Sequence, residues 1–295
     1  MVDRQGNYGA SDSSHRSRYR TAAGRLMRLA AAFVLLVALL PSGQDSVASE
    51  PFGAEDRGAE SHIPSIPEPM VFDLVRGLGA RRGECEVNVL GLFPLNRSSE
   101  PAPSGFDPFG LAPGSEDRDG IEWAPEIEYA IADGFAPEFE LPFENSHLEA
   151  YKFAAQWTFG TRCDQRFIDG AQVIVEPDVE FEVWDLTFLY LAGMQFNRRW
   201  SMLGMIGARP EIVSGGSNRT DGIANLTVFY DVDYSTTVGL ESNFTFGDKD
   251  RTSLLLIPQI DFEITDHVEF QFGGGAGFST EAVEPIIGTR LIYSR

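Results

Sequence analysis

Apolar side chains alternate with charged or polar ones over residues 121–159, and this two-residue period limits the possible folds more than any other feature of the chain. Odd positions before Asp133-Gly134 carry Ile121, Trp123, Ile127, Tyr129 and Ile131, and glutamates lie between them. The odd positions after it are again mostly aromatic. Successive side chains of a strand point to opposite faces. The segment therefore predicts a hairpin with an aromatic–aliphatic face and a carboxylate face.

The same period continues to the end of the chain and predicts a further series of strands. With the first hairpin, the strands are expected at about 83–94, 121–132, 135–144, 147–160, 168–177, 184–196, 199–210, 222–233, 236–247, 252–264, 267–278 and 285–294. No helix is expected beyond a single turn at residues 72–75. The chain from residue 71 onward is thus predicted to be all-β.

The connections between these strands differ in length in an ordered way. Residues 132–134, 197–199 and 265–267 are three-residue turns, and Gly134 suits the left-handed position of a type I turn with a bulge. The intervening connections, such as 96–120, are mostly longer and rich in Pro, Gly and Ser. Short turns at one end and long loops at the other are typical of an antiparallel up-and-down transmembrane β-barrel, here of about 12 strands over residues 71–295.

A soluble β-sandwich or lipocalin-like barrel would show the same alternation with its faces reversed. The aromatic content of the apolar faces and the asymmetry of the turns favour the membrane barrel. The lipid-facing aromatic candidates are then Trp123, Tyr129, Phe139, Phe143, Tyr151, Phe153, Trp157 and Phe272. The lumen-facing candidates are Glu126, Glu128, Glu138, Glu140, Lys152, Arg209, Glu241, Asp261, Glu263, Glu269 and Arg290.

The carboxylate face has to be hydrated or neutralised. A three-residue turn places Glu126 opposite Glu140 and Glu128 opposite Glu138, and like charges directly opposite each other destabilise a sheet. Lys152 is the nearest candidate counter-charge, and Arg209 and Arg290 lie farther round the wall. A wet acidic lumen that favours cations and a lumen packed with ion pairs both fit this pattern.

The amino terminus predicts export. Six arginines precede an apolar run at residues 29–40, which is short for a membrane helix, and small residues follow near Ser49. Residues 1–49 are therefore expected to be a signal peptide, with an uncleaved anchor as the alternative, and 50–70 a disordered acidic, Pro-rich linker. Cleavage would remove six Arg and three Asp, taking the net charge from −21 to −21 − (6 − 3) = −24. So acidic a chain is not expected to bind nucleic acid.

No arrangement of residues predicts catalysis, a cofactor or a metal site. His147 and His267 are expected at opposite ends of the barrel, and His62 lies in the linker. Cys85 and Cys163 have no histidine neighbours to complete a metal site. Several strands are expected between them, which disfavours a disulfide.

Several motifs resemble those of a bacterial outer-membrane barrel family described as putative MetA-pathway of phenol degradation or transporter-like. The resemblance lies in the hairpin from Trp123-Ala124-Pro125-Glu126 to Glu140-Leu141-Pro142, in residues 190–200 and 229–231, and in the closing Gly288–Tyr293. It covers roughly residues 71–295 and implies an outer-membrane channel, with hydrophobic or aromatic substrates suggested. Such barrels commonly end on an aromatic residue that the barrel-assembly machinery recognises, whereas Ser294 and Arg295 follow Tyr293 here.

The leading functional expectation is an outer-membrane channel that passes small solutes, hydrophobic or aromatic ones included, through an acidic lumen. A structural or adhesive surface barrel with a plugged lumen is the alternative. A soluble periplasmic binding protein is the third possibility. The choice depends on which face of the strands is wet and on what fills the barrel.

Overall fold

The computed structural model describes residues 63–295 except 73, 96–119, 215, 248–251 and 280–282. The predicted signal peptide and residues 50–62 of the predicted linker lie outside this part of the chain. The described residues form strands and connections and contain no helix long and apolar enough to cross a membrane. The strands are β1 (Cys85–Pro94), β2 (Glu122–Tyr129), β3 (Phe135–Glu140), β4 (Phe143–Glu144), β5 (His147–Leu148), β6 (Lys152–Arg162), β7 (Phe167–Pro177), β8 (Val183–Gln195), β9 (Trp200–Val213), β10 (Arg219–Asp231), β11 (Thr236–Phe246), β12 (Ser253–Thr265), β13 (Val268–Phe278) and β14 (Val283–Ser294).

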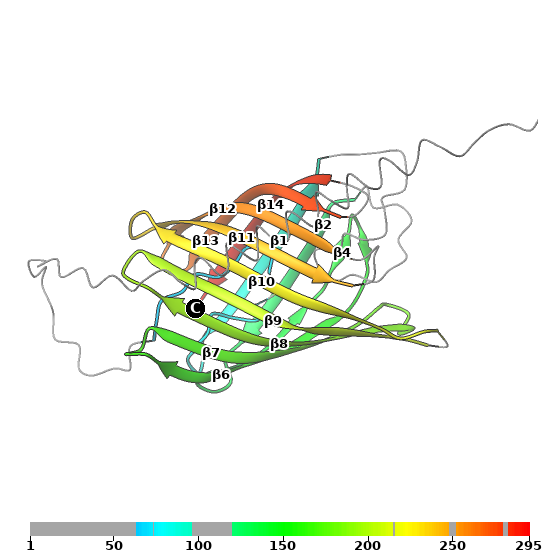
Figure 1. The fold of residues 1–295 in the computed structure, drawn as a ribbon, viewed down its shortest axis with the longest axis horizontal. Coiled ribbons are helices and arrows are strands. Elements are labelled where there is room, and N and C mark those ends of the chain that lie inside the picture. Colours follow the sequence, from blue (N-terminus) through cyan, green and yellow to red (C-terminus); the bar gives the residue numbers. More distant parts are fainter. Residues whose placement is uncertain (1–62, 73, 96–119, 215, 248–251, 280–282) are drawn as a thin grey trace, which may run out of the picture. The chain divides into compact units, whose positions relative to one another are not determined.

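The strands close into an antiparallel barrel (Figure 1). From β6 to β14 each strand pairs with its neighbours in the chain, β3 pairs with β2 and β6, and β1 closes the ring by pairing with β14 on one side and β2 on the other. Twelve strands form the wall, as predicted, because β4 and β5 are short extensions of the β2–β3 hairpin. Closure leaves no unpaired sheet edge, which is the condition for a β-structure to span a lipid bilayer.

The turn geometry of the first hairpin agrees with the prediction. Gly134 has a φ of 71°, in the left-handed region that glycine adopts without strain. The register pairs Glu126 with Glu140 and Glu128 with Glu138, so these four glutamates face one another in pairs. The β2–β3, β6–β7, β8–β9, β10–β11 and β12–β13 turns lie at the end of the barrel where β1 begins, which we call the turn end. The opposite end is called the loop end.

The apolar faces of the strands point outward. Large side chains are about half-exposed along the outer wall, among them Ile206 at 63%, Phe153 at 51%, Phe188 at 50% and Tyr129 at 47%. Their neighbours of opposite parity are buried and mostly polar, for example Gln172, Glu241 and Gln271. A soluble barrel has the reverse arrangement, because water then lies outside. The outer wall is thus an apolar surface of the kind that contacts lipid or another protein.

The interior is filled in part by the chain itself. Residues 63–80, which we call the lumen segment, lie inside the barrel before β1 begins (Figure 1). Met70 and Val75 are fully buried, and Leu74 is 2% exposed. The prediction of a disordered linker up to residue 70 therefore does not describe residues 63–70, which are held by the wall. The single helical turn predicted at 72–75 is also absent, since the described residues 72, 74 and 75 are not helical.

Candidate functional site: the occupied lumen

The lumen segment is a loop that enters the barrel and turns back within it. Its two limbs meet near the turn end, where the side chain of Ile63 packs against Gly79. Higher in the lumen the backbone N–H of Gly77 donates a hydrogen bond to the carboxylate of Glu68. Gly79 N–H donates to Thr158 Oγ1 on β6, and Gly134 N–H donates to the carbonyl of Ala80. The C-terminal limb is therefore anchored to the wall at the turn end, and the N-terminal limb packs against it there.

The tip of the loop is held by side chains in the middle of the barrel wall. Glu241 Oε2, on β11, accepts hydrogen bonds from the backbone N–H groups of Met70 at 3.0 Å and Val71 at 3.1 Å. Gln259 Oε1 accepts a weaker bond from Met70 N–H at 3.3 Å. On the opposite limb Val75 N–H donates to Gln172 Oε1. Buried backbone N–H groups need hydrogen-bond partners, and the described residues of this segment have no paired strand to supply them. The side chains of Glu241, Gln259 and Gln172 supply these partners instead.

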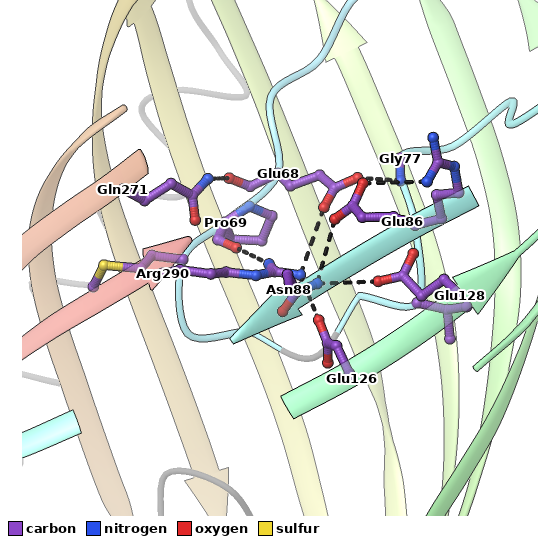
Figure 2. Close-up of polar contacts among 12 residues, drawn as sticks. Glu68, Pro69, Gly77, Glu86, Asn88, Glu126, Glu128, Gln271 and Arg290 are labelled. Atoms are coloured by element: carbon purple, nitrogen blue, oxygen red, sulfur yellow. Dashed lines mark hydrogen bonds and ion pairs between the residues drawn. The ribbon is translucent and has the colours of Figure 1, made fainter. Parts of the chain in front are cut away.

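Arg290 connects the lumen segment to the acidic face (Figure 2). Its Nη2 donates to Glu126 Oε1 at 2.7 Å and lies 3.8 Å from Glu68 Oε2, and its Nη1 donates to the carbonyl of Pro69 at 3.2 Å. Gln271 Nε2 donates to the carbonyl of Glu68. The Arg290 side chain is only 4% exposed, so this ion pairing takes place away from bulk water. One wall arginine thus binds both a wall carboxylate and the loop.

A second arginine, on the lumen segment itself, contacts β1 and the residue before it. Arg76 pairs with Glu86 at 3.2 Å and Glu84 at 3.3 Å. Burial lowers the pKa of Arg76, but the charges of Glu86, Glu68, Glu128 and Glu84 outweigh it and raise that pKa above its ordinary value. Arg76 is therefore a fixed positive charge among these carboxylates.

Other carboxylates of β1 to β3 are bound from different sides. Asn88 Nδ2 donates to both Glu86 and Glu128 at 3.3 Å (Figure 2). Lys152 forms a short ion pair with Glu140, as its position on the neighbouring strand predicted. Carboxylate oxygens of Glu126, Glu138 and Glu140 lie within 4.8 Å of one another, close enough to hold a cation. Glu126 and Glu140 already have the cationic partners Arg290 and Lys152, so this grouping is explained without a metal.

The other side of the lumen is apolar. The lumen segment contributes Phe72, Leu74 and Val75 to a cluster with inward side chains of β7 to β10, including Leu189, Leu191, Leu203, Met205, Ile223 and Phe229. A second cluster places Met70 and Val71 against β1, β12 and β14, through Leu90, Leu92, Leu255, Ile257 and Ile286. The loop is therefore amphipathic: its apolar side chains meet apolar wall and its Glu68 and Arg76 meet charged wall. Such matching indicates specific docking.

Inward-facing glycines provide the space for the largest loop side chains. A Cβ atom on Gly288 would lie 2.5 Å from Met70 Cε, and one on Gly273 would lie 2.7 Å from the same atom. On β8 a Cβ atom on Gly193 would lie 2.4 Å from Ile66 Cδ1. Separations this short do not occur between real side chains. A side chain at these positions would therefore make the ends of the Met70 and Ile66 side chains move from their present places against the wall.

The structure places the other predicted lumen residues at several levels. Arg209 is half-buried on β9, directly opposite the buried Asp221 of β10. Asp261 is buried and accepts hydrogen bonds from Gln259, and the half-buried Glu269 accepts one from Gln271. Glu263 differs, because it is exposed near the end of β12. The polar wall residues therefore extend from the turn end to the loop end, whereas the lumen segment reaches only part of this height.

Several of the predicted outer aromatic residues form ring pairs on the outer wall. Trp123 stacks on Phe143 with ring centroids 4.4 Å apart, and Phe139 packs on Phe153 at 5.1 Å. Tyr129, Phe153, Trp157 and Phe272 are exposed, while Trp123, Phe139, Phe143 and Tyr151 are half-buried by their neighbours. Cross-strand aromatic pairs of this kind stabilise a sheet from its outer face.

The cysteines and histidines stay apart in the structure. Cys85 and Cys163 are free thiols. His147 on β5 and His267 in the β12–β13 turn lie at opposite ends of the barrel. His62 lies outside the described residues.

The functional feature that the strand pattern did not reveal is the lumen segment. One signal for it was present in the sequence. Met70, Val71, Phe72, Leu74 and Val75 form a short apolar run between Pro- and Gly-containing stretches, and such a run is too hydrophobic for a solvated linker. It has no two-residue period, because each residue is placed by the surrounding wall rather than by a sheet.

Comparisons with known proteins support the barrel fold, and the matching family profile covers the lumen segment. A family profile described as HAEPLYID-like matches residues 63–167, less than half of the chain, and this stretch begins where the lumen segment begins. No curated protein matches the sequence significantly. The chain is similar in structure to the COG4313 outer-membrane channel from Pseudomonas putida F1, with a TM-score of 0.57 and 14% identity over 76% of this chain and 100% of that one.

Two porins show a similar likeness. The KdgM porin, in complex with disordered oligogalacturonate, gives a TM-score of 0.51 and 11% identity over 70% of this chain and 98% of its own. The NanC porin gives 0.53 and 8% identity over the same shares. At these identities the likeness is one of fold. The chain folds as a closed twelve-stranded antiparallel barrel similar to outer-membrane porins and channels.

Proposed function

We propose that this protein is a bacterial outer-membrane channel that its own lumen segment holds closed, and that this segment has to shift before a solute can pass. One observation carries the proposal: in a porin-like barrel, the described residues of 63–80 lie in the lumen and contact both an acidic and an apolar side of the wall. Hydrogen bonds and ion pairs anchor the segment, and none of its described residues belongs to a strand. A loop held by side-chain contacts can leave the wall without unfolding the barrel.

The outer wall supports the membrane location. Half-exposed aromatic and aliphatic side chains surround the barrel, and closure satisfies the backbone within the wall. In water an apolar surface of this extent would aggregate. The similar fold of known outer-membrane channels is consistent with this location.

The two walls indicate which solutes would suit the open channel. A displaced loop would expose the apolar side chains of β7 to β10 opposite the carboxylates of β1 to β3. Such a passage favours small aromatic or amphiphilic molecules that are neutral or cationic. The acidic wall would repel a polyanion such as the oligogalacturonate bound by the KdgM porin. We therefore infer a different solute class for this barrel.

A permanently closed structural or adhesive barrel is the second candidate. It is favoured by the number of contacts that hold the lumen segment, on both its polar and its apolar sides. The long connection predicted to carry an adhesive surface includes residues 96–119, which lie outside the described part of the chain. The two candidates differ in whether a loosened segment opens the barrel.

The substitution Gly288→Leu tests this difference. A leucine side chain would occupy the position of Met70 Cε and so expel the tip of the lumen segment. We expect the variant to conduct ions in planar bilayers several-fold better than the natural protein. The matched control is Gly274→Ala on the adjacent strand, whose added Cβ would meet nothing closer than 3.9 Å. Retention of the barrel is checked by the heat-dependent gel mobility of the folded form.

Two outcomes would contradict the proposal. Equal, near-zero conductance of a folded Gly288→Leu barrel and the natural protein would favour the structural barrel. High conductance of the natural protein, unchanged by the substitution, would mean that the lumen segment does not close the channel.

A further inference from the structure

Arginines gather on two of the short turns at the turn end. Arg162 and Arg166 flank the β6–β7 turn, and Arg198 and Arg199 form the β8–β9 turn. All four are exposed, and we call them the arginine patch. The other three short turns carry no arginine or lysine and each contains an aspartate: Asp133, Asp233 and Asp266. The β6–β7 turn also contains an aspartate, Asp164, between its two arginines. The net charge of the chain is −21, and these four arginines lie on two turns that are joined by neighbouring strands; Arg81, Arg82 and Arg295 also lie at the turn end, next to β1 and β14.

Backbone contacts hold the two turns side by side. Gln195 N–H, at the end of β8, donates to the carbonyl of Arg166 at 2.8 Å. Asn197 Oδ1 accepts from Arg199 N–H at 2.8 Å and from Trp200 N–H at 3.0 Å, which fixes the second turn. Asp231 N–H donates to the carbonyl of Arg199 at 2.8 Å. The arginine patch therefore lies on a rigid part of the rim.

The surroundings of the arginine patch are aromatic on the outer face. Arg199 Nη1 donates to Tyr230 Oη at 2.9 Å, and its guanidinium carbon lies 6.0 Å from the centroid of that ring. Trp200 packs on Tyr230 with ring centroids 4.9 Å apart and is 45% exposed. Aromatic side chains with one wet and one apolar side are typical of the membrane–water interface.

Two of the four guanidinium groups are already engaged. Arg162 pairs with Asp169 at 3.0 Å, and Asp169 also accepts from Tyr190 Oη at 2.9 Å. Arg199 is oriented by Tyr230. Among the described residues the side chains of Arg166 and Arg198 have neither an ion-pair nor a hydrogen-bond partner. Two unpaired guanidinium groups on adjacent turns, beside exposed aromatic rings, provide phosphate-binding donors at the edge of the apolar wall.

We propose that the arginine patch binds the phosphate of an anionic phospholipid headgroup in the leaflet that surrounds the turn end. The acyl chains of the bound lipid lie along the apolar outer wall of β6 to β9, where Phe188 and Ile206 are at least half-exposed. A soluble polyanion would use the arginines but not this wall. This lipid site rests on the membrane location proposed above. It specifies an anionic phospholipid as the ligand and the arginine patch as its binding place.

The test compares lipids retained by the full-length barrel. The protein is inserted into vesicles of phosphatidylcholine with about one-tenth phosphatidylglycerol, extracted in mild detergent and examined by native mass spectrometry. We expect preferential retention of phosphatidylglycerol. The double variant Arg166→Gln/Arg198→Gln should lower this preference by roughly fivefold per arginine, since each contributes about 1 kcal/mol near an anionic surface. Arg82→Gln, an exposed arginine at the same end but beside Asp133, is the control.

The possible failures have different meanings. Equal retention of the two lipids by an inserted barrel would overturn the lipid site and leave the membrane location intact. An equal loss of preference in Arg82→Gln would show that general charge, and not the arginine patch, selects the lipid. Failure to insert into either vesicle would overturn both the lipid site and the proposed location. Binding of soluble inositol hexaphosphate without any lipid preference would point to a soluble polyanion instead.

Discussion

At the scale of residues, the interior contains a network of buried polar contacts, and single side chains hold the lumen segment. Glu241 is fully buried and accepts two backbone N–H groups of that segment, while Arg290 binds both Glu126 and the carbonyl of Pro69. An unmatched buried donor costs about 1–3 kcal/mol, so each of these contacts affects whether the loop stays in place.

Glu241→Ala is expected to loosen the tip of the loop. It removes the acceptor of Met70 and Val71 N–H, and their amide hydrogens should exchange with solvent roughly ten- to a hundredfold faster. Glu241→Gln keeps an acceptor oxygen and should show a smaller increase. Hydrogen–deuterium exchange of the peptide that contains Met70 measures the effect, and Glu263→Ala, at an exposed position outside the loop contacts, is the control. Unchanged exchange in Glu241→Ala would mean that this carboxylate does not hold the loop.

At the scale of elements, the strands were predictable and the lumen segment was not. The two-residue period fixes which face of each strand is apolar, and a three-residue turn at Gly134 fixes the register of the first hairpin. Lys152 was identified as a partner of the acidic face from its strand position, and Arg290 was named as a candidate without its contacts. Residues 63–80 carry no period, because wall residues from several strands, some more than a hundred positions away, hold their conformation. Sequence neighbours give no information about such contacts.

Depth-dependent substitution on the outer wall tests the membrane interpretation of the strands. Phe188 lies near the middle of β8 and is 50% exposed, whereas Phe196 follows the end of that strand. If lipid surrounds the barrel, Phe188→Arg should lower the free energy of unfolding by about 2–4 kcal/mol and Phe196→Arg by about 0–1 kcal/mol. Urea unfolding in lipid vesicles measures both. Equal small effects would indicate that water contacts the middle of β8.

At the scale of the whole molecule, the barrel is a porin-like wall with an inner loop. The proposed function requires the wall to stay closed and the loop to move. The closed wall is continuous and stable, and the loop is attached by side-chain contacts on one acidic and one apolar side. Function as a channel requires that these contacts break while the wall remains intact. The central claim is therefore that movement of residues 63–80 controls passage.

Single-channel recording of a tethered loop tests this claim most directly. Cysteines replace Met70 and Gly273, whose positions are in contact, in a chain where Cys85 and Cys163 are serines. A short thiol crosslinker then joins the loop to β13. We predict openings before crosslinking, their disappearance afterwards, and their return when a cleavable crosslinker is cut. Openings of the same size and frequency in the crosslinked barrel would contradict the account.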